Sequence, residues 1–372
     1  MNPFTYVQTA RVVFGAGAVR DVGVEIKSLG RGRALIVTDR WLRDQTDLCA
    51  RVERALGARL AGVFDEVLPD AAADVVDRGA ERAREVAADC LVSVGGGSAI
   101  DTAKGMALCL ALGGGIRAHQ GTQLLDRRAI AHLAIPTTAG TGSEVSIYAV
   151  VKDDRSREKL HFMDERLAPD VALLDPELTL TLPPGLTAAT GLDALTHAVE
   201  SYTSVNAGPL SDAQALHATR LIARALVRAV EHGADLAARA DMLVAANLAG
   251  AAMSNAGVGL AHAIAHSVGA RHGVHHGTAN AIVLPHVIRW NSDTLAARYR
   301  DLGEALGVAD LADGCAALLE RCGLPGRLRD VGVPAADRRA LAETAVADGA
   351  IAYNGKFAGD AELVLGVIEA AW

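Results

Sequence analysis

Carboxylate and imidazole side chains recur at helical spacing in the second half of the chain. Asp193 and His197 are four residues apart, as are His262 and His266, and His276 follows in a His-His-Gly turn. Residues four apart lie on one face of a helix, so each pair can point at one ion. One hard oxygen ligand with several imidazoles suits a divalent transition metal such as Fe²⁺ or Zn²⁺. Such an ion can act as a Lewis acid on a carbonyl or alcohol oxygen.

The candidate ligands outnumber the needs of one ion. His272 and His275 lie close to the others in the sequence, whereas a metal site with an open position takes three or four protein ligands. Some of the candidate histidines must therefore have a role other than metal binding. His272 and His275 are equally consistent with exposed turn residues. The chain has no His-Glu-x-x-His motif, so a zincin protease is not indicated.

A glycine-rich loop in the first half has the features of a phosphate site. Gly95, Gly96, Gly97 and Ser98 directly follow a predicted strand and precede a helix that contains Asp101, Thr102, Ala103 and Lys104. Glycines let backbone amides approach a phosphate closely, and the helix offers unpaired N–H groups and a positive dipole end. The alternative is a tight strand-to-helix turn that binds nothing. The loop Gly15-Ala16-Gly17 lacks a third glycine and is predicted to be an ordinary turn.

Two further features suit a dinucleotide. The segment from Thr137 to Glu144, which contains Thr138, Thr141 and Ser143, is rich in hydroxyl groups and follows a predicted strand, where open α/β sheets bind ligands. Asp39 ends the predicted strand from Leu35 to Thr38, and its carboxylate can accept hydrogen bonds from ribose hydroxyls and repel a 2′-phosphate, which favours NAD over NADP. The alternatives are a surface loop for the first and a helix N-cap or solvated carboxylate for the second.

The elements that would position these residues fall into two halves. Strands are predicted at 34–38, 90–94, 132–136 and 171–175, alternating with helices that include 82–88 and 100–112. This alternation predicts crossover units and a mostly parallel sheet. After Pro183-Pro184 the chain has helical composition, as at 211–230 and 238–253. We therefore expect an α/β dinucleotide-binding domain over 1–182 and an all-helical metal-binding, catalytic domain over 183–372.

Composition narrows the possible functions. The chain has 372 residues, 51% of them hydrophobic, which suffices for two ordinary domains. A net charge of −8 argues against nucleic acid as a partner. The N-terminus shows no signal peptide, and the longest apolar run, 105–116, is shorter than the roughly 20 residues that span a bilayer. Five scattered cysteines suggest buried free thiols, and the cytoplasm is the expected location.

In combination the motifs resemble the iron-containing alcohol dehydrogenase family (group III, metal-dependent). The resemblance runs from about Phe14 to Asn291 and includes the segments 37–39, 95–104, 136–144, 191–200, 259–266, 276–281 and 284–286. It implies a two-domain fold with the cofactor and metal in the cleft between the halves. It implies an NAD(H)-linked alcohol dehydrogenase or aldehyde reductase that transfers hydride between nicotinamide and a small alcohol, aldehyde or keto substrate, as a homodimer.

The resemblance also implies roles for individual residues. The metal, Fe²⁺ first and Zn²⁺ as the alternative, would be held by Asp193, His197, His262 and His276. His266 would lie beside the nicotinamide as the proton-relay candidate. Lys159 matches a family lysine near the cofactor. The expected NAD(H) contacts are Asp39, Gly95, Gly96, Gly97, Ser98, Asp101, Thr137, Thr138, Thr141, Ser143 and Lys159.

Three segments depart from the family pattern. Pro69-Asp70 stands where Asn-Pro is common, which alters a cofactor-side contact and adds negative charge. Residues 353–356 replace an Asn-Pro-Arg-Pro segment, and Ser267-Val268 replaces a small residue followed by proline or glutamine. The last two bear on substrate identity more than on reaction type.

Other functions on a related fold remain open. Maleylacetate reductases resemble the chain at 4–6, 11–17 and 175–183, but they usually lack an acid at the position of Asp193, and a dicarboxylate would have only Arg271 to bind it. Cyclising lyases such as dehydroquinate synthase need a cluster of lysines and arginines around the metal for a phosphorylated substrate, and the ligand segments here are poor in lysine. A non-catalytic binding protein would leave the ligand set without a use.

Overall fold

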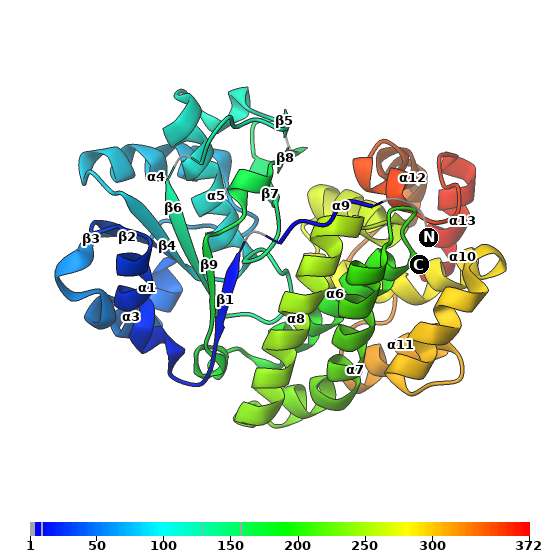
Figure 1. Cartoon of the computed structure of the whole chain (residues 1–372). Coiled ribbons are helices and arrows are strands. Elements are labelled where there is room, and N and C mark those ends of the chain that lie inside the picture. Colours follow the sequence, from blue (N-terminus) through cyan, green and yellow to red (C-terminus); the bar gives the residue numbers. More distant parts are fainter. Residues whose placement is uncertain (1–3, 9, 129, 157) are drawn as a thin grey trace. The chain divides into compact units, whose positions relative to one another are not determined.

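The computed structural model describes residues 4–8, 10–128, 130–156 and 158–372. The described chain forms two compact units. The first, an α/β unit, holds residues 7–138 and 142–181, and the second, a helical unit, holds residues 4–6, 139–141 and 182–372. In Figure 1 the α/β unit runs from dark blue to green and most of the helical unit from green to red.

A parallel sheet of six strands forms the centre of the α/β unit. Its order is β1-β9-β6-β4-β2-β3, with bounds β1 Arg11–Phe14, β2 Ala34–Val37, β3 Leu60–Phe64, β4 Cys90–Gly95, β6 Ala131–Pro136 and β9 Val171–Leu174. The four strands predicted from apolar runs are confirmed, and β1 and β3 add two edges. Strands β2, β4, β6 and β9 are buried along their whole length, which explains why they are continuously apolar rather than alternating.

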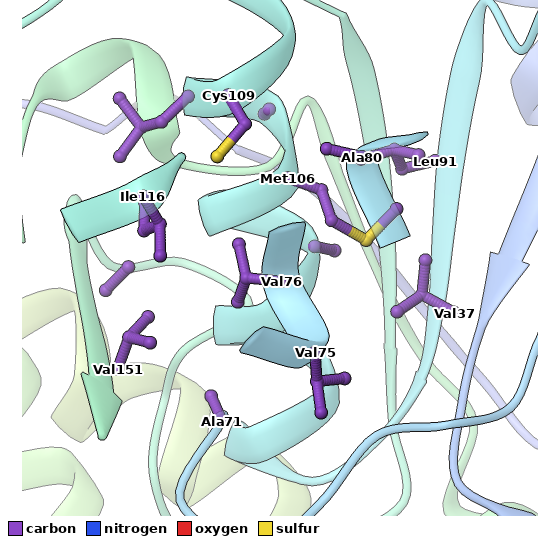
Figure 2. Close-up of a cluster of buried hydrophobic side chains, with 14 of the residues drawn as sticks. Val37, Ala71, Val75, Val76, Ala80, Leu91, Met106, Cys109, Ile116 and Val151 are labelled. Atoms are coloured by element: carbon purple, nitrogen blue, oxygen red, sulfur yellow. The ribbon is translucent and has the colours of Figure 1, made fainter. Parts of the chain in front are cut away.

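Alternate residues of each strand face opposite sides of the sheet, and helices cover both sides. On β2, Leu35 and Val37 join one hydrophobic cluster, whereas Ala34 and Ile36 join another. The first cluster includes residues of α4 and α5 (Figure 2), and the second includes residues of α1 and α3. The helices of the unit are α1 Val22–Ser28, α2 Arg40–Gln45, α3 Leu48–Leu56, α4 Ala73–Glu85 and α5 Gly97–Leu112.

Two local predictions differ from the structure. The helix expected over 82–88 ends at Glu85, because Ala87 has a positive φ of 47°. The helix expected from Ile100 begins already at Gly97, so Gly97 and Ser98 form its first turn. The α/β unit also contains a second sheet, with the order β5-β8-β7; its strands are β5 Gly121–Thr122, β7 Tyr148–Asp153 and β8 Glu158–Met163. Short 3-10 helices complete the unit: η1 Ala18–Asp21, η2 Gly57–Arg59, η3 Ile116–Ala118, η4 Glu165–Leu167 and η5 Pro176–Thr179.

The helical unit is built around α6, Pro184–Thr203, in which every residue from Thr187 to Thr203 is buried. It packs against α7, α8 and α10, and small residues permit close approach: a Cβ at Gly191 would lie 2.4 Å from Leu226 Cδ1. The remaining helices are α7 Pro209–Glu231, α8 Leu236–Ala256, α9 Leu260–His272, α10 His276–Leu306, α11 Leu311–Arg321, α12 Arg338–Val346 and α13 Ala361–Ala371, with the 3-10 helices η6 Leu328–Val331, η7 Ala335–Asp337 and η8 Gly349–Tyr353.

Helix α8 has the length and apolar composition that a membrane crossing would need, alone among the helices of the described residues. Of its most apolar 18-residue window, 67% is buried inside the protein. Since α8 packs against α6 and α7, its apolar character is accounted for by its place in the core of the helical unit.

The five cysteines are free thiols, and all of them are buried, as the sequence predicted. Burial raises the pKa of each thiol, for Cys322 to about 11 and for Cys49 to about 12. Such thiols remain protonated near neutral pH and are poor nucleophiles.

Candidate metal centre and phosphate-binding loop

Three helices bring a carboxylate and two imidazoles together. Asp193 lies on α6, His262 in the first turn of α9, and His276 is the first residue of α10. One ligand atom from each lies within 4.8 Å of the other two. Asp193 Oδ1 is 3.9 Å from His262 Nε2 and 3.6 Å from His276 Nε2. Asp193 and His262 are buried, and the side chain of His276 is 26% exposed, so the group is open on one side.

The approach of α10 to α6 depends on a glycine. A Cβ at Gly277 would lie 2.3 Å from the carbonyl oxygen of Ala189 and 3.2 Å from Asp193 Cβ. Only glycine fits this contact without moving a backbone, and the neighbouring His276 thereby comes within reach of Asp193. The His-Gly pair that the sequence singled out thus has a packing reason.

A buried glutamate orients His262. Glu200, on α6, accepts hydrogen bonds at its carboxylate from the backbone N–H groups of Gly259 (2.8 Å) and Ala261 (2.6 Å) and from His262 Nδ1 (2.6 Å). Burial by itself would raise the pKa of Glu200, but these hydrogen bonds outweigh it and the pKa lies below its usual value. With Nδ1 donating to Glu200, His262 presents Nε2 to the site, where this buried nitrogen has no hydrogen-bond partner among the described residues.

The fourth predicted ligand, His197, lies beside the group of three without belonging to it. Its ring stacks on that of His262 with centroids 4.6 Å apart, and it shares a hydrogen bond with the backbone of Gly140. Burial lowers its pKa to about 4, so the imidazole is neutral and able to donate a lone pair near neutral pH. Its Nδ1 is buried without a hydrogen-bond partner in the part of the chain that the structure describes.

His266, the predicted proton relay, is next to this group. It is one helical turn beyond His262, and its ring stacks on that of His276 with centroids 5.3 Å apart. Its Nδ1 lies 2.8 Å from Asp348 Oδ2, and the other oxygen of Asp348 accepts from Ala350 N at the start of η8. Asp348 therefore fixes the orientation of the His266 ring.

Asn280 connects two of the candidate ligands. Its buried Nδ2 donates to Asp193 Oδ1 at 2.8 Å and lies 3.1 Å from His276 Nε2. The amide thus orients Asp193 from the side of α10.

The donor set fits a divalent transition ion. One carboxylate with imidazole nitrogens is the ligand chemistry of Fe²⁺ and Zn²⁺. Such an ion would satisfy the buried nitrogens of His262 and His197 that have no hydrogen-bond partner among the described residues.

In the α/β unit the glycine loop joins β4 to α5. Gly95 has φ +152°, and a Cβ there would lie 2.8 Å from Ala99 Cβ. Gly96 is the N-cap of the sixteen-residue α5, and a Cβ there would lie 3.2 Å from the side chain of Thr138. Without side chains at these positions, the N-terminal amides of α5 are accessible to an anion such as a phosphate.

Asp101 and Lys104, one turn further along α5, hold the segment that leads into β7. Lys104 Nζ donates to Ser146 O (2.9 Å) and Tyr148 O (2.6 Å), and Asp101 Oδ2 accepts from Val150 N (3.1 Å). Burial lowers the pKa of Lys104 to about 8 and raises that of Asp101. Asp101, predicted as a coenzyme contact, is thus engaged with the protein backbone.

Different residues of the hydroxyl-rich segment 137–144 contact the glycine loop and helix α6. Thr137 N donates to Gly95 O at 3.0 Å, which ties the segment to the glycine loop, where Thr138 packs against Gly96. Gly140 packs against α6, where a Cβ would lie 2.6 Å from Thr190 Cβ. Thr141 is partly exposed and Ser143 is buried.

Asp39 lines a hollow of about 620 Å³ in the α/β unit. The hollow is also bordered by Gly96 and Ser98 and by the exposed apolar side chains of Trp41 and Leu68. Asp39 is at the same time the N-cap of α2, because its Oδ1 accepts from Leu42 N at 2.8 Å. The N-cap alternative raised from the sequence is thus present, in a residue that also borders this hollow.

Lys159, on β8, lies 3.5 Å from Asp70, the residue at which the chain departs from the family pattern. The Asp70 backbone N–H in turn donates to Ser98 Oγ at 3.1 Å. Asp70 therefore contacts both Lys159 and the first turn after the glycine loop.

A parallel α/β sheet with a glycine loop, together with a carboxylate–imidazole centre on helices, defines a metal-dependent, dinucleotide-linked dehydrogenase. The sequence matches the model of the iron-containing alcohol dehydrogenases over residues 9–176 and that of the C-terminal part of the same family over residues 187–372. The chain therefore belongs to the iron-containing alcohol dehydrogenase family, whose reaction class is NAD(H)-linked, metal-dependent interconversion of alcohols with aldehydes or ketones.

Individual relatives agree over nearly the whole chain. NAD-dependent methanol dehydrogenase of Bacillus methanolicus is 40% identical over 349 residues, which cover 90% of this chain and 91% of the relative. 1,3-Propanediol dehydrogenase of Citrobacter freundii is 40% identical over 362 residues, 93% of either chain. The crystal structure of a 1,3-propanediol oxidoreductase superposes with a TM-score of 0.96 at 35% identity over all of both chains.

Maleylacetate reductases are more distant. The structure of the enzyme from Agrobacterium tumefaciens superposes with a TM-score of 0.86 at 28% identity, covering 100% of this chain and 99% of that one. The alternative of oxo-dicarboxylate reduction is thus placed behind alcohol dehydrogenation.

Sequence reasoning overlooked the roles of three residues in the helical unit. Glu200 could have been found, because a carboxylate three residues after His197 in an apolar helix requires buried partners. Asn280 is one helical turn from His276 and could have been inferred from that spacing. No local sequence pattern pointed to Asp348, because it is separated from His266 by 82 residues in the sequence.

Proposed function

We propose that Asp193, His197, His262 and His276 hold one divalent ion, Fe²⁺ first and Zn²⁺ as the alternative, in a helical domain that begins at residue 183. The convergence of Asp193, His262 and His276 within 4.8 Å carries the proposal. His197 is the proposed fourth ligand, because its ring stacks on that of His262 with centroids 4.6 Å apart. When bound, the ion supplies Lewis acidity toward the oxygen of a small alcohol or carbonyl substrate.

We assign NAD(H) binding to the domain formed by residues 1–182. The loop at Gly95, Gly96, Gly97 and Ser98 offers backbone amides to the diphosphate, and Asp39 accepts hydrogen bonds from the adenosine ribose. Thr137, Thr138, Thr141, Ser143 and Lys159 complete the contacts, and Asp101 acts by fixing the segment that carries Ser143. The coenzyme supplies the hydride acceptor or donor.

His266 is the proposed proton relay. Its Nδ1 is engaged with Asp348 at 2.8 Å, so Nε2 can accept a proton during alcohol oxidation and return it during reduction. Asp348 stabilises the imidazolium that forms, as a carboxylate behind a catalytic histidine does.

The remaining expectations concern the context of the enzyme. We propose primary alcohols and aldehydes of a few carbons as substrates, because the named relatives act on such molecules. A homodimer in the cytoplasm is the corresponding expectation, and light scattering of the purified protein measures the subunit number.

Metal removal and restoration test the proposed function. Protein stripped with a chelator is expected to lose NADH oxidation on a panel of short aldehydes, and Fe²⁺ or Zn²⁺ is expected to restore it. His262→Ala is expected to retain no stoichiometric metal by elemental analysis, whereas His217→Ala, at an exposed position of α7, retains it. Full turnover by metal-free protein, or equal metal content in the two variants, would contradict the proposal, and faster turnover of maleylacetate than of any aldehyde would favour the more distant function.

A further inference from the structure

An ion pair stands beside the glycine loop of the α/β unit. Asp70 Oδ1 lies 3.5 Å from Lys159 Nζ, and the backbone N–H of Asp70 donates to Ser98 Oγ at 3.1 Å. Ser98 is in the first turn of α5, and Pro69, next to Asp70, borders the 620 Å³ hollow together with Gly96. The carboxylate of Asp70 therefore belongs to the surroundings of the proposed diphosphate site.

The backbone holds this carboxylate in a fixed place. Asp70 and the following Ala71 have φ angles of +63° and +51°, in a region that L-residues occupy at a cost of about 1 kcal/mol or more each. Lys152 N donates to both carbonyl oxygens, at 3.1 Å to Asp70 O and 2.9 Å to Ala71 O, and Ala71 is buried. Strain of this kind persists only where the surrounding structure imposes it, so Asp70 is not part of a freely moving loop.

Lys159 differs from Lys104 in that its ammonium group can still respond to an anion. The ammonium group of Lys104 is buried and donates to Ser146 O, Ser146 Oγ and Tyr148 O. Lys159, whose side chain is 12% exposed, has Asp70 as its ion-pair partner, and its charge also acts on Asp101. The carboxylate of Asp70 therefore reduces the electrostatic attraction between Lys159 and a bound diphosphate.

We propose that Asp70 sets the affinity for the coenzyme: it neutralises Lys159 and adds a negative charge beside the glycine loop, so that NAD and NADH bind more weakly and leave faster than they otherwise would. The inference rests on the proposed function, since it needs the diphosphate at this loop. The effect is electrostatic and acts on both oxidation states, because they share the diphosphate. The free energy of an ion pair with one exposed partner corresponds to a two- to fivefold change in a dissociation constant.

The isosteric Asp70→Asn variant tests the inference. Asparagine tolerates a positive φ at least as well as aspartate and keeps the backbone contact to Ser98, so the fold is retained. Measured by the fluorescence of NADH, the dissociation constant is expected to fall about two- to fivefold at 20 mM salt and to approach the wild-type value at 500 mM salt. ADP, as a competitor of NADH, is expected to gain in the same way, whereas adenosine, which has no phosphate, is expected to gain nothing.

Two further variants separate this effect from a general change of charge. Glu85→Gln breaks the exposed ion pair with Arg82 at the C-terminal end of α4, changes the net charge by the same amount and is expected to leave NADH binding unchanged. Lys159→Gln is expected to weaken NADH binding, and in that background Asp70→Asn is expected to have at most half of its effect.

The inference and the proposed function fail in different ways. If wild-type protein binds NADH but Asp70→Asn does not bind it more tightly, or if Glu85→Gln gives the same gain, the inference is wrong and the coenzyme site stands. An equal gain for adenosine also overturns the inference, because the diphosphate would then not be the group affected. If the wild-type protein binds neither NADH nor ADP, the proposed coenzyme site itself is wrong.

Discussion

The buried carboxylate of Glu200 accepts hydrogen bonds from three residues at the start of α9. The donors are Gly259 N, Ala261 N and His262 Nδ1, each at 2.8 Å or less. These bonds tie the start of α9 to α6 and fix the tautomer of His262. A ligand imidazole held in this way is a stronger donor to a metal, because its second nitrogen shares a proton with an acid.

Replacing Glu200 by glutamine is expected to weaken metal binding by about 10- to 100-fold. The amide has one oxygen where the carboxylate has two, so one of the three donors would face an NH₂ group. Competition with a fluorescent chelator measures the affinity for Zn²⁺, and circular dichroism of the metal-free variant reports whether the helices remain. Glu231→Gln, at an exposed position on α7, is the matched control. Unchanged affinity in a folded Glu200→Gln protein would show that the acid only stabilises the fold.

The contact between α6 and α10 depends on the absence of a side chain. Gly277 brings the first turn of α10 against the backbone of Ala189, so the element that carries His276 is placed by a contact that no other residue type can make. Gly140 makes a similar contact with Thr190, at which a Cβ would come within 2.8 Å of the carbonyl oxygen. Two segments distant in sequence thus meet α6 through glycines, at the adjacent residues Ala189 and Thr190.

Gly277→Ala is expected to force α10 away from α6, destabilise the helical unit by about 1–3 kcal/mol and reduce the metal content of the purified protein. Gly366→Ala is the matched control, because a Cβ on that glycine of α13 meets nothing within 4 Å. There alanine is expected to leave stability unchanged or to raise it by up to about 1 kcal/mol, through its higher helix propensity. Equal thermal midpoints and equal metal contents for the two variants would show that α6 and α10 adapt without loss.

A neutral histidine in the main sheet makes the stability of the whole molecule depend on pH. His132, on β6, lies with its Nε2 2.8 Å from Ser93 Oγ on β4. Burial, with smaller contributions from Lys104 and Arg128, lowers its pKa to about 3, from 6.5 in an unfolded chain. Between these values the unfolded chain binds a proton that the folded chain does not, so the free energy of unfolding falls as the pH decreases from 6.5 toward 3. Above pH 6.5 both states are neutral and the contribution is constant.

Urea unfolding at pH 7.5 and pH 5.0 measures this effect. Wild-type protein is expected to lose about 2 kcal/mol more between the two pH values than His132→Gln, since each pH unit below 6.5 costs about 1.4 kcal/mol. His217→Gln, at an exposed position of α7, is expected to behave like the wild type. The same loss in His132→Gln as in wild type would show that other groups cause the pH dependence.

The sequence predicted what is encoded locally. Apolar runs identified β2, β4, β6 and β9, because a strand buried on both faces must be apolar throughout, and the four-residue spacing of His262 and His266 identified their common helix face. The small sheet with β5 and β7 was missed, because those strands are short or alternate in burial and take their identity from β8. Asp348 and the Asp70–Lys159 pair were missed for a related reason: their partners are 82 and 89 residues away, and only the folded chain brings them together.

The double engagement of Asp39 constrains any attempt to redesign the chain for a phosphorylated dinucleotide. One oxygen of this side chain closes the first turn of α2, a helix of only six residues that carries Trp41 on the wall of the hollow. Exchanging it for alanine would remove the repulsive charge and the cap of α2 together, so that a gain in binding and a loss of helix stability could not be told apart. Asparagine or serine would remove the charge and still cap the helix. A designer who wants the new coenzyme should therefore begin with those two residues.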